Sequence, residues 1–210
     1  MTTGSRNRGV LSQVVMNKNK NIQASSFDRV YNVSMKIGVI SDTHIEDLGF
    51  GVDFLNRMTS GPFAAVDLIL HAGDIVHPDL LHCFDRKPIV AVKGNCDETA
   101  PELPIKRIFE TDGFRIGLIH GWGGPSGIIA NVLKEFSSES IDALVFGHSH
   151  YPLCRMHGDI LLFNPGSALD RRDAPFHSAG ILNLDEKISG RILNLEAELK
   201  SDPVISGAFA

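Results

Sequence analysis

The stretch that decides the fold is residues 35–44, MKIGVISDTH, in which a short apolar run is followed at once by polar residues. A continuous apolar run of this length is typical of a strand that is buried on both faces of a sheet. Asp42 and His44 follow the run with a spacing of two, so in an extended chain both side chains point to the same side. The stretch therefore predicts a buried strand over 35–41 whose carboxyl end carries two side chains able to bind one metal ion.

Strand-like and helix-like segments alternate in the rest of the first half. Short apolar runs over 66–71 and 88–92 predict two more buried strands. Helical spacing predicts a helix over 50–59, and an opening proline predicts a short one over 78–84. The resulting β-α-β-α-β order implies parallel strands joined by right-handed crossovers.

The second half of the chain predicts mainly hairpins. One hairpin is expected over 106–120 around Thr111-Asp112-Gly113, another over 151–163, and a last one that pairs 179–184 with 191–196. A helix over 126–136 and a strand over 143–146 complete the set. The two halves together predict an α/β protein in which two sheets pack on each other with the helices outside.

Five of the predicted strands end in side chains that can bind a metal ion. These side chains are Asp42, His44, Asp74, Asn95, His120, His148 and His150. In open α/β sheets ligands bind at the carboxyl ends of the strands, so we expect the seven to meet at one edge. Each short motif alone is a common surface turn, but five of them in order favour a metal site.

The number and type of these ligands predict the kind of site. Seven ligands exceed what one tetrahedral ion requires and suit two ions that share a ligand. Imidazole, carboxylate and amide oxygen favour manganese, iron, zinc, cobalt or nickel over calcium. Two divalent cations, two aspartates and a bridging hydroxide leave a net charge of about +1, which attracts a phosphate group.

Composition limits the class of protein further. The chain has 20 Lys and Arg against 25 Asp and Glu, and this net charge of −5 argues against strong nucleic-acid binding. No apolar run approaches the roughly 18 residues that a membrane span requires. Cys83, Cys96 and Cys154 have neither disulfide-framework nor zinc-finger spacing, which fits a reducing compartment. We therefore expect a cytoplasmic protein without a membrane partner.

Residues 1–34 differ in composition from the rest of the chain. They are polar, with five basic residues and one acidic residue, and they lack the apolar core of a secretory signal. A flexible or loosely docked extension is favoured over a transit peptide, and Met35 is a candidate native start. Residues 35–200 are expected to form one domain, followed by a tail over 201–210.

The ordered motifs D-x-H, G-D, G-N-x-D, H-G and G-H-x-H resemble those of the calcineurin-like metallophosphoesterase superfamily. Within it the chain is similar to the small YfcE-type phosphodiesterases, with G-N-C-D at 94–97 and N-P-G-S at 164–167 as further likenesses. The resemblance covers residues 35–197 and implies a four-layer α/β/β/α sandwich with a dinuclear metal centre.

The resemblance also implies a ligand set and catalytic residues. Asp42, His44 and His150 would hold one ion, Asn95, His120 and His148 the other, and Asp74 would bridge both. We assign the catalytic role to Asp74, Asn95 and His120.

Cys96 departs from the pattern of many superfamily members, which carry at this position a histidine that protonates the leaving group or steadies the phosphate. A hydroxide that bridges two ions can still attack phosphorus, although about 10²–10⁴-fold of general acid catalysis is lost. We therefore expect the enzyme to favour phenol-like leaving groups over alkoxides. Cys96 is interpreted as a neighbour that fills space beside the metal site rather than as a nucleophile.

The sequence thus predicts a metal-dependent phosphodiesterase for small diesters, with manganese as the first candidate metal and a homo-oligomer left open. Two alternatives stay open: a metal-binding scaffold like the retromer subunit of the same fold, and a phosphomonoesterase. Arg171 and Arg172 are candidates for a phosphate clamp, against a solvated pair. Trp122 is a candidate wall for an aromatic substrate.

Overall fold

The computed structural model describes residues 34–84, 87–98, 100–124, 126–199 and 209. All of them belong to the second of the two units into which the chain divides, Val33–Ala210. The predicted extension over 1–34 and the predicted tail over 201–210 therefore lie outside the described residues, apart from Ser34 and Phe209.

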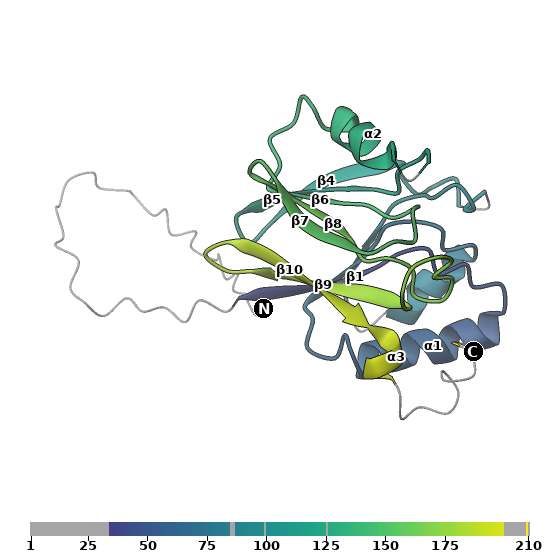
Figure 1. Ribbon diagram of the computed structural model, residues 1–210. Helices are drawn as coiled ribbons and strands as arrows, with labels where there is room; N and C mark the ends of the chain where they lie inside the picture. Colours follow the sequence, from purple (N-terminus) through teal and green to yellow (C-terminus); the bar gives the residue numbers. More distant parts are fainter. Residues whose placement is uncertain (1–33, 85–86, 99, 125, 200–208, 210) are drawn as a thin grey trace, which may run out of the picture. The chain divides into compact units, whose positions relative to one another are not determined.

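The first sheet has the strand predicted over 35–41 at its centre. Its strands are β1 (Met35–Ile40), β2 (Leu68–His71), β3 (Ile89–Ala91), β9 (Ser178–Leu184) and β10 (Ile188–Asn194), in the order β10-β9-β1-β2-β3. β1, β2 and β3 are parallel, as the alternation of segments predicts, and β9 is antiparallel to both of its neighbours. The helix α1 (Leu48–Ser60) and the 3-10 helix η1 (Pro78–Phe84) connect the parallel strands (Figure 1).

The second sheet contains the two central hairpins. Its strands are β4 (Lys106–Thr111), β5 (Phe114–Ile119), β6 (Ala143–Val145), β7 (Leu153–His157) and β8 (Ile160–Asn164), in the order β4-β5-β6-β8-β7. β6 pairs in parallel with β5 and β8, while both hairpins are antiparallel. The helix α2 (Ile128–Glu135) follows β5 and lies over the outer face of this sheet (Figure 1).

Three separate hydrophobic clusters show that the sheets and helices form four layers. Ile37 of β1 points into the cluster between the two sheets, where it joins Phe163 of β8. Ile40 of the same strand joins Phe54 of α1 in a second cluster on the other face of the first sheet. A third cluster, which includes Val132, joins α2 to the outer face of the second sheet. The α/β/β/α arrangement implied by the sequence is thus confirmed.

Several element boundaries differ from the predicted ones because of local capping. α1 begins at Leu48 rather than at residue 50, since the Asp47 side chain accepts a hydrogen bond from the Phe50 backbone N–H (2.7 Å). The last strand, predicted over 191–196, instead covers Ile188–Asn194. It gives way to the short helix α3 (Leu195–Glu198), because the Asn194 side chain accepts a hydrogen bond from the Ala197 backbone N–H.

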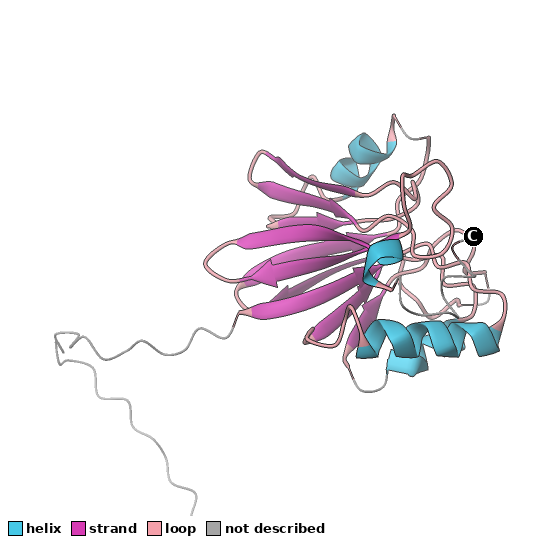
Figure 2. Ribbon diagram, turned by 60° about the horizontal axis from the view of Figure 1, so that its bottom comes forward, coloured by secondary structure: helices cyan, strands magenta, loops and turns pink. Residues whose placement is uncertain are grey.

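The loops that follow β1, β2, β3, β5 and β6 carry the candidate metal ligands. Figure 2 shows most of the longer loops gathered at one end of the strands, with tight hairpin turns at the other end. Among the described residues, no helix is both long and apolar enough to cross a bilayer.

Candidate metal centre

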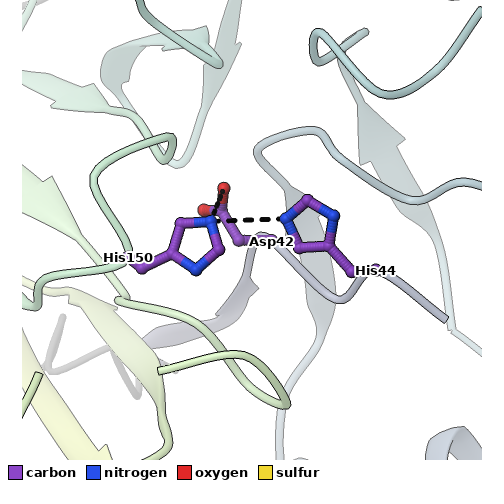
Figure 3. A group of neighbouring side chains, drawn as sticks. All are labelled: Asp42, His44 and His150. Atoms are coloured by element: carbon purple, nitrogen blue, oxygen red, sulfur yellow. Dashed lines mark hydrogen bonds and ion pairs between the residues drawn. The ribbon is translucent and has the colours of Figure 1, made fainter. Parts of the chain in front are cut away.

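The structure brings the seven candidate ligands together, as two sets of three with Asp74 between them. In the first set, His150 Nε2 lies 3.3 Å from Asp42 Oδ1 and 3.3 Å from His44 Nε2 (Figure 3). In the second set, Asn95 Oδ1 lies 3.2 Å from His120 Nε2 and 3.0 Å from His148 Nδ1. Parallel strands that end at a common edge produce this meeting of residues distant in the sequence.

Asp74 lies between the two sets. Its Oδ2 atom is 3.5 Å from His44 Nε2 in the first set and 3.4 Å from His120 Nε2 in the second. Its other oxygen, Oδ1, accepts a hydrogen bond from the Cys96 backbone N–H (2.8 Å). One carboxylate oxygen is thus fixed by the protein, while the other faces both sets of histidines.

The backbone at this edge is strained at the candidate ligands themselves. Five of the seven have positive φ, between 44° and 66°: Asp42, His44, Asp74, His148 and His150. Side chains other than glycine rarely adopt this conformation, and where they do so in a group the site is usually functional. The prediction that Asp42 and His44 point to the same side of an extended chain is therefore wrong, because the chain is not extended at these residues. The pairs converge through left-handed loops.

Two of the histidine rings are held so that one nitrogen faces the cluster with a lone pair. His120 Nδ1 lies 2.7 Å from the Ala72 carbonyl oxygen, and His150 Nδ1 contacts the Asp170 carbonyl oxygen. A neutral ring that donates through Nδ1 leaves Nε2 as an acceptor. These acceptors and two buried carboxylates point at the same space, and a cation there satisfies all of them. The donor set therefore fits bound metal.

Burial and the charges of the cluster together shift the pKa values of three candidate ligands. Burial raises the pKa of Asp42 to about 7, although the nearby His120 opposes the rise. Burial also raises the pKa of Asp74, but the hydrogen bond and charge of His120 outweigh it and leave the pKa below its usual value. Burial lowers the pKa of His120, yet the carboxylates of Asp74 and Asp42 raise it further than burial lowers it. Asp74 and His120 thus stabilise each other's charged forms, whereas burial disfavours the charged form of Asp42.

Asp97 fixes the loops that carry Asp74 and Asn95. Its buried carboxylate accepts hydrogen bonds from four backbone N–H groups, at 2.7–2.9 Å, which belong to Asp74, Ile75, Val76 and Gly94. The sequence indicated Asp97 only as part of the G-N-C-D motif. The loop that supplies three of the four donors comes from another part of the chain, so sequence spacing does not reveal this role.

The N-P-G-S segment supports the site from the side of the second sheet. Asn164 Nδ2 donates to the Gly147 carbonyl oxygen (2.9 Å), just before His148. Ser167 Oγ donates to the Asp42 carbonyl oxygen (2.7 Å). A Cβ at Gly147 would lie 2.0 Å from Ser41 Oγ, so only glycine allows this close approach of the two loops.

His71 lies beside the cluster but is not a candidate ligand. Its Nδ1 accepts from the Gly73 backbone N–H (3.2 Å) and its Nε2 lies 3.3 Å from Thr43 Oγ1. Burial lowers its pKa to about 4, so the ring is neutral. Both of its nitrogens have protein partners, which is the buried structural role that its place at the end of an apolar strand predicts.

Cys96 is exposed at the rim of the cluster. Burial of its sulfur, followed by the negative charge of Asp74, raises the pKa of the thiol to about 11. Its Sγ accepts a hydrogen bond from Asn95 Nδ2 (3.2 Å). Because thiolate is the nucleophilic form, a thiol with this pKa is a poor nucleophile at neutral pH.

Comparison with known families gives one match that spans most of the chain. Residues 35–187 match the family described as the calcineurin-like phosphoesterase superfamily domain. A probable metallophosphoesterase of Methanothermobacter thermautotrophicus is 38% identical over 167 residues, which cover 78% of this chain and 94% of that protein. The phosphodiesterase YfcE of Escherichia coli K12 is 31% identical over 105 residues, which cover 46% of this chain and 53% of that protein.

Solved structures with the same fold include both a predicted phosphoesterase and a sorting protein. The predicted phosphoesterase, from Streptococcus pneumoniae, has a TM-score of 0.58 at 24% identity and covers 77% of this chain and 90% of its own. Vps29 of Entamoeba histolytica has a TM-score of 0.59 at 22% identity and covers 76% of this chain and 99% of its own. At these identities the likeness shows the fold alone.

Proposed function

Because the chain belongs to the calcineurin-like phosphoesterase superfamily, we propose that it is a metal-dependent phosphodiesterase that acts on small diesters. The position of Asp74 is the observation that carries this proposal. One of its carboxylate oxygens lies within 3.5 Å of a histidine nitrogen from each set of ligands. A carboxylate so placed suits a bridge between two cations.

Under this proposal each set of ligands holds one divalent ion. Asp42, His44 and His150 would hold one, Asn95, His120 and His148 would hold the other, and Asp74 would contact both. When bound, the two ions supply a hydroxide nucleophile at neutral pH and neutralise charge on the phosphoryl oxygens. Nitrogen and oxygen ligands favour manganese as the first candidate, followed by nickel, iron, zinc or cobalt.

The chain's own residues orient the ligands for this reaction. The Ala72 carbonyl holds the His120 ring with Nε2 toward Asp74, and the Asp170 carbonyl holds the His150 ring with Nε2 toward Asp42. Partners of this kind fix the tautomer and the direction of a metal-binding ring. We assign Asp74, Asn95 and His120 to the catalytic set, because His120 contacts both of the others and Asp74 lies between the two sets of ligands.

Charge and composition support a small substrate. The net charge of −5 disfavours a long nucleic-acid partner, so we propose a small diester as substrate. We also propose the cytoplasm as the compartment, because the cysteine spacing fits a reducing environment. Residues 35–200 would carry this activity as one domain.

Hydrolysis of two chromogenic esters by metal-stripped protein tests the proposed function. After removal of metal with a chelator, Mn²⁺, Ni²⁺, Zn²⁺ or Mg²⁺ is added back, and bis-p-nitrophenyl phosphate is compared with p-nitrophenyl phosphate. We expect metal-dependent cleavage that favours the diester and is lost in His120→Ala. The matched control is His157→Ala, because His157 is exposed at the end of β7 and away from the ligand set. Preferential cleavage of the monoester would instead support a phosphomonoesterase.

A histidine at position 96 is expected to help with poor leaving groups. Cys96 cannot act as an effective proton donor at neutral pH, because burial and Asp74 raise the pKa of its thiol to about 11. We expect Cys96→His to raise the rate on an alkyl leaving group by about 10²-fold and to change the p-nitrophenyl rate far less. Rates on two diesters measure both effects: p-nitrophenyl methyl phosphate carries the p-nitrophenyl leaving group, and dimethyl phosphate carries an alkyl one. An equal change on the two leaving groups would show that position 96 does not assist the departing oxygen.

Metal affinity is expected to weaken as pH falls below about 7. Burial raises the pKa of Asp42 to about 7, and the carboxylates around His120 raise its pKa above the usual value despite burial. Protons therefore compete with metal at these two groups, and affinity should fall by about tenfold per pH unit for each proton displaced. His148 and His150 add little, since burial lowers their pKa. Calorimetric titration at pH 6 in two buffers of different ionisation enthalpy should show proton release, and identical enthalpies would contradict the prediction.

A metal-binding scaffold is the second candidate function. The fold is shared with Vps29, whose identity of 22% to this chain shows the fold and nothing of its role. Five strained ligands gathered around shared space favour the enzyme, because a scaffold gains nothing from that backbone strain. Binding of metal without cleavage of either ester would favour the scaffold.

A further inference from the structure

A cavity of about 570 Å³ lies between α2 and the loops before β7 and after β8, and its walls are mostly apolar. Half of its lining residues are large apolar or aromatic side chains: Ile128 and Ile129 of α2, Phe146 after β6, Tyr151 before β7, and Leu153 in β7. Its volume lies within the roughly 300–1,000 Å³ that is typical of small-molecule sites. The proposed reaction does not use this cavity.

The cavity and the candidate metal centre share the loop after β6. Ser149 lines the cavity and stands between His148 and His150 in the chain. Phe146, at the end of the strand that leads into this loop, also lines the cavity. A group bound in the cavity therefore contacts the loop that carries both histidines.

Arg172 joins the cavity to the cluster. It lines the cavity, has a positive φ of 48°, and its Nε lies 3.5 Å from Asp170 Oδ2. The same Asp170 oxygen lies 3.5 Å from His150 Nδ1, so the guanidinium is tied to a candidate ligand.

The charges of the lining specify what the cavity accepts. Arg172 is the one cationic side chain among the described residues that line the cavity, and its ion pair with Asp170 places it beside His150. Asp173, which also lines the cavity, repels a second anionic group. The apolar walls and the rings of Phe146 and Tyr151 suit a neutral ring system.

A second, smaller cavity adjoins the other half of the centre. It has a volume of about 300 Å³ and is lined by Asn95 and His120 together with Ile105 and Trp122. Trp122 is 43% exposed and Ile105 is 72% exposed, so this side is open. A diester has two substituents on one phosphate, so this second cavity offers room for the other substituent.

We propose that the larger cavity binds a neutral aromatic substituent of the substrate, while Arg172 binds a phosphoryl oxygen beside it. This inference rests on the proposed function, because it names the class of diester that the same site accepts. The preferred substrate is then a phosphodiester with a neutral ring on at least one side.

Binding of two simple phosphonates tests the proposal without turnover. Phenylphosphonate and methylphosphonate carry the same anionic group and differ only in the substituent, so their affinity ratio isolates the cavity. By calorimetry on manganese-loaded protein, we expect phenylphosphonate to bind roughly 10-fold to 100-fold more tightly. Ile129→Trp, which fills the cavity, should reduce this ratio to near one. The matched control Val52→Trp, at an exposed aliphatic position of α1, should keep it.

Arg172→Ala separates the anion clamp from the cavity. It should weaken both phosphonates by a similar factor, about tenfold, because the guanidinium contacts their common group. Equal affinities for the two phosphonates in the unaltered protein, or a ratio that survives Ile129→Trp, would overturn the cavity assignment. If Ile129→Trp does not fold, Tyr151→Ala removes an aromatic wall of the cavity instead and should also lower the ratio; Tyr151 is 56% exposed, so this variant should fold. Because no ester is cleaved, the result stands apart from success or failure of the diesterase assay.

Discussion

Asp74→Asn is expected to lower kcat/KM for bis-p-nitrophenyl phosphate by about 10³-fold or more. The amide keeps the size of the side chain but removes the negative charge that would balance two cations in the proposed site. It also replaces one acceptor oxygen by an NH₂ group, so the residue can no longer face His44 and His120 with an acceptor while it accepts from the Cys96 backbone N–H. The loss therefore concerns both charge and bridging geometry.

The matched control for this variant is Asp112→Asn. Asp112 is also an aspartate with positive φ (49°), but it lies in the exposed β4–β5 hairpin turn. Asparagine tolerates the left-handed conformation, so neither variant should unfold the chain. Activity and bound metal per chain are measured for both. A decrease of less than tenfold in Asp74→Asn, with metal content unchanged, would show that Asp74 does not bridge the ions.

Asp97→Ala is expected to have the second largest effect, on both stability and activity. Four backbone N–H groups lose their acceptor, and all belong to the loops that carry Asp74 and Asn95. Removal of a buried, hydrogen-bonded carboxylate of this kind lowers the free energy of unfolding by about 3–5 kcal/mol. Activity should fall by about 10-fold to 100-fold at temperatures where the variant is still folded, because the ligands lose their support.

Urea denaturation and metal affinity measure the two effects of Asp97→Ala separately. The matched control is Asp67→Ala, because Asp67 is exposed and accepts one hydrogen bond, from the Lys36 backbone N–H at 2.8 Å. That variant should lose about 1 kcal/mol or less and keep its affinity for metal. A loss from Asp97→Ala no greater than that from Asp67→Ala would contradict the role given to Asp97.

The sequence was sufficient to predict the layers and the members of the candidate site. Apolar runs of four to six residues predicted the buried strands, because a strand covered on both faces has no room for polar side chains. The edge rule for parallel strands then placed Asp42, Asn95, His120 and His148 together although more than 100 residues separate the first from the last.

The local geometry of the site was beyond the reach of sequence spacing. The left-handed conformation of His44 and His150 is imposed by tertiary contacts and goes against their intrinsic preference. The supporting role of Asp97 depends on donors from a different loop, and the place of Arg172 depends on Asp170 beside His150. Short-range patterns carry no signal for contacts of this kind. The helix α3, which replaces the predicted end of the last strand, has the same kind of cause in one asparagine cap.

A manganese titration followed by electron paramagnetic resonance tests most directly whether two ions share the Asp74 carboxylate. Chelator-stripped protein is titrated with Mn²⁺ while the number of ions bound per chain and the spectrum are recorded. We predict two ions per chain and, as the second binds, the loss of the isolated Mn²⁺ signal in favour of a spin-coupled pair, with the coupling altered in Asp74→Asn. A single bound ion, or two ions that keep the spectrum of isolated Mn²⁺, would show that no carboxylate is shared by two ions.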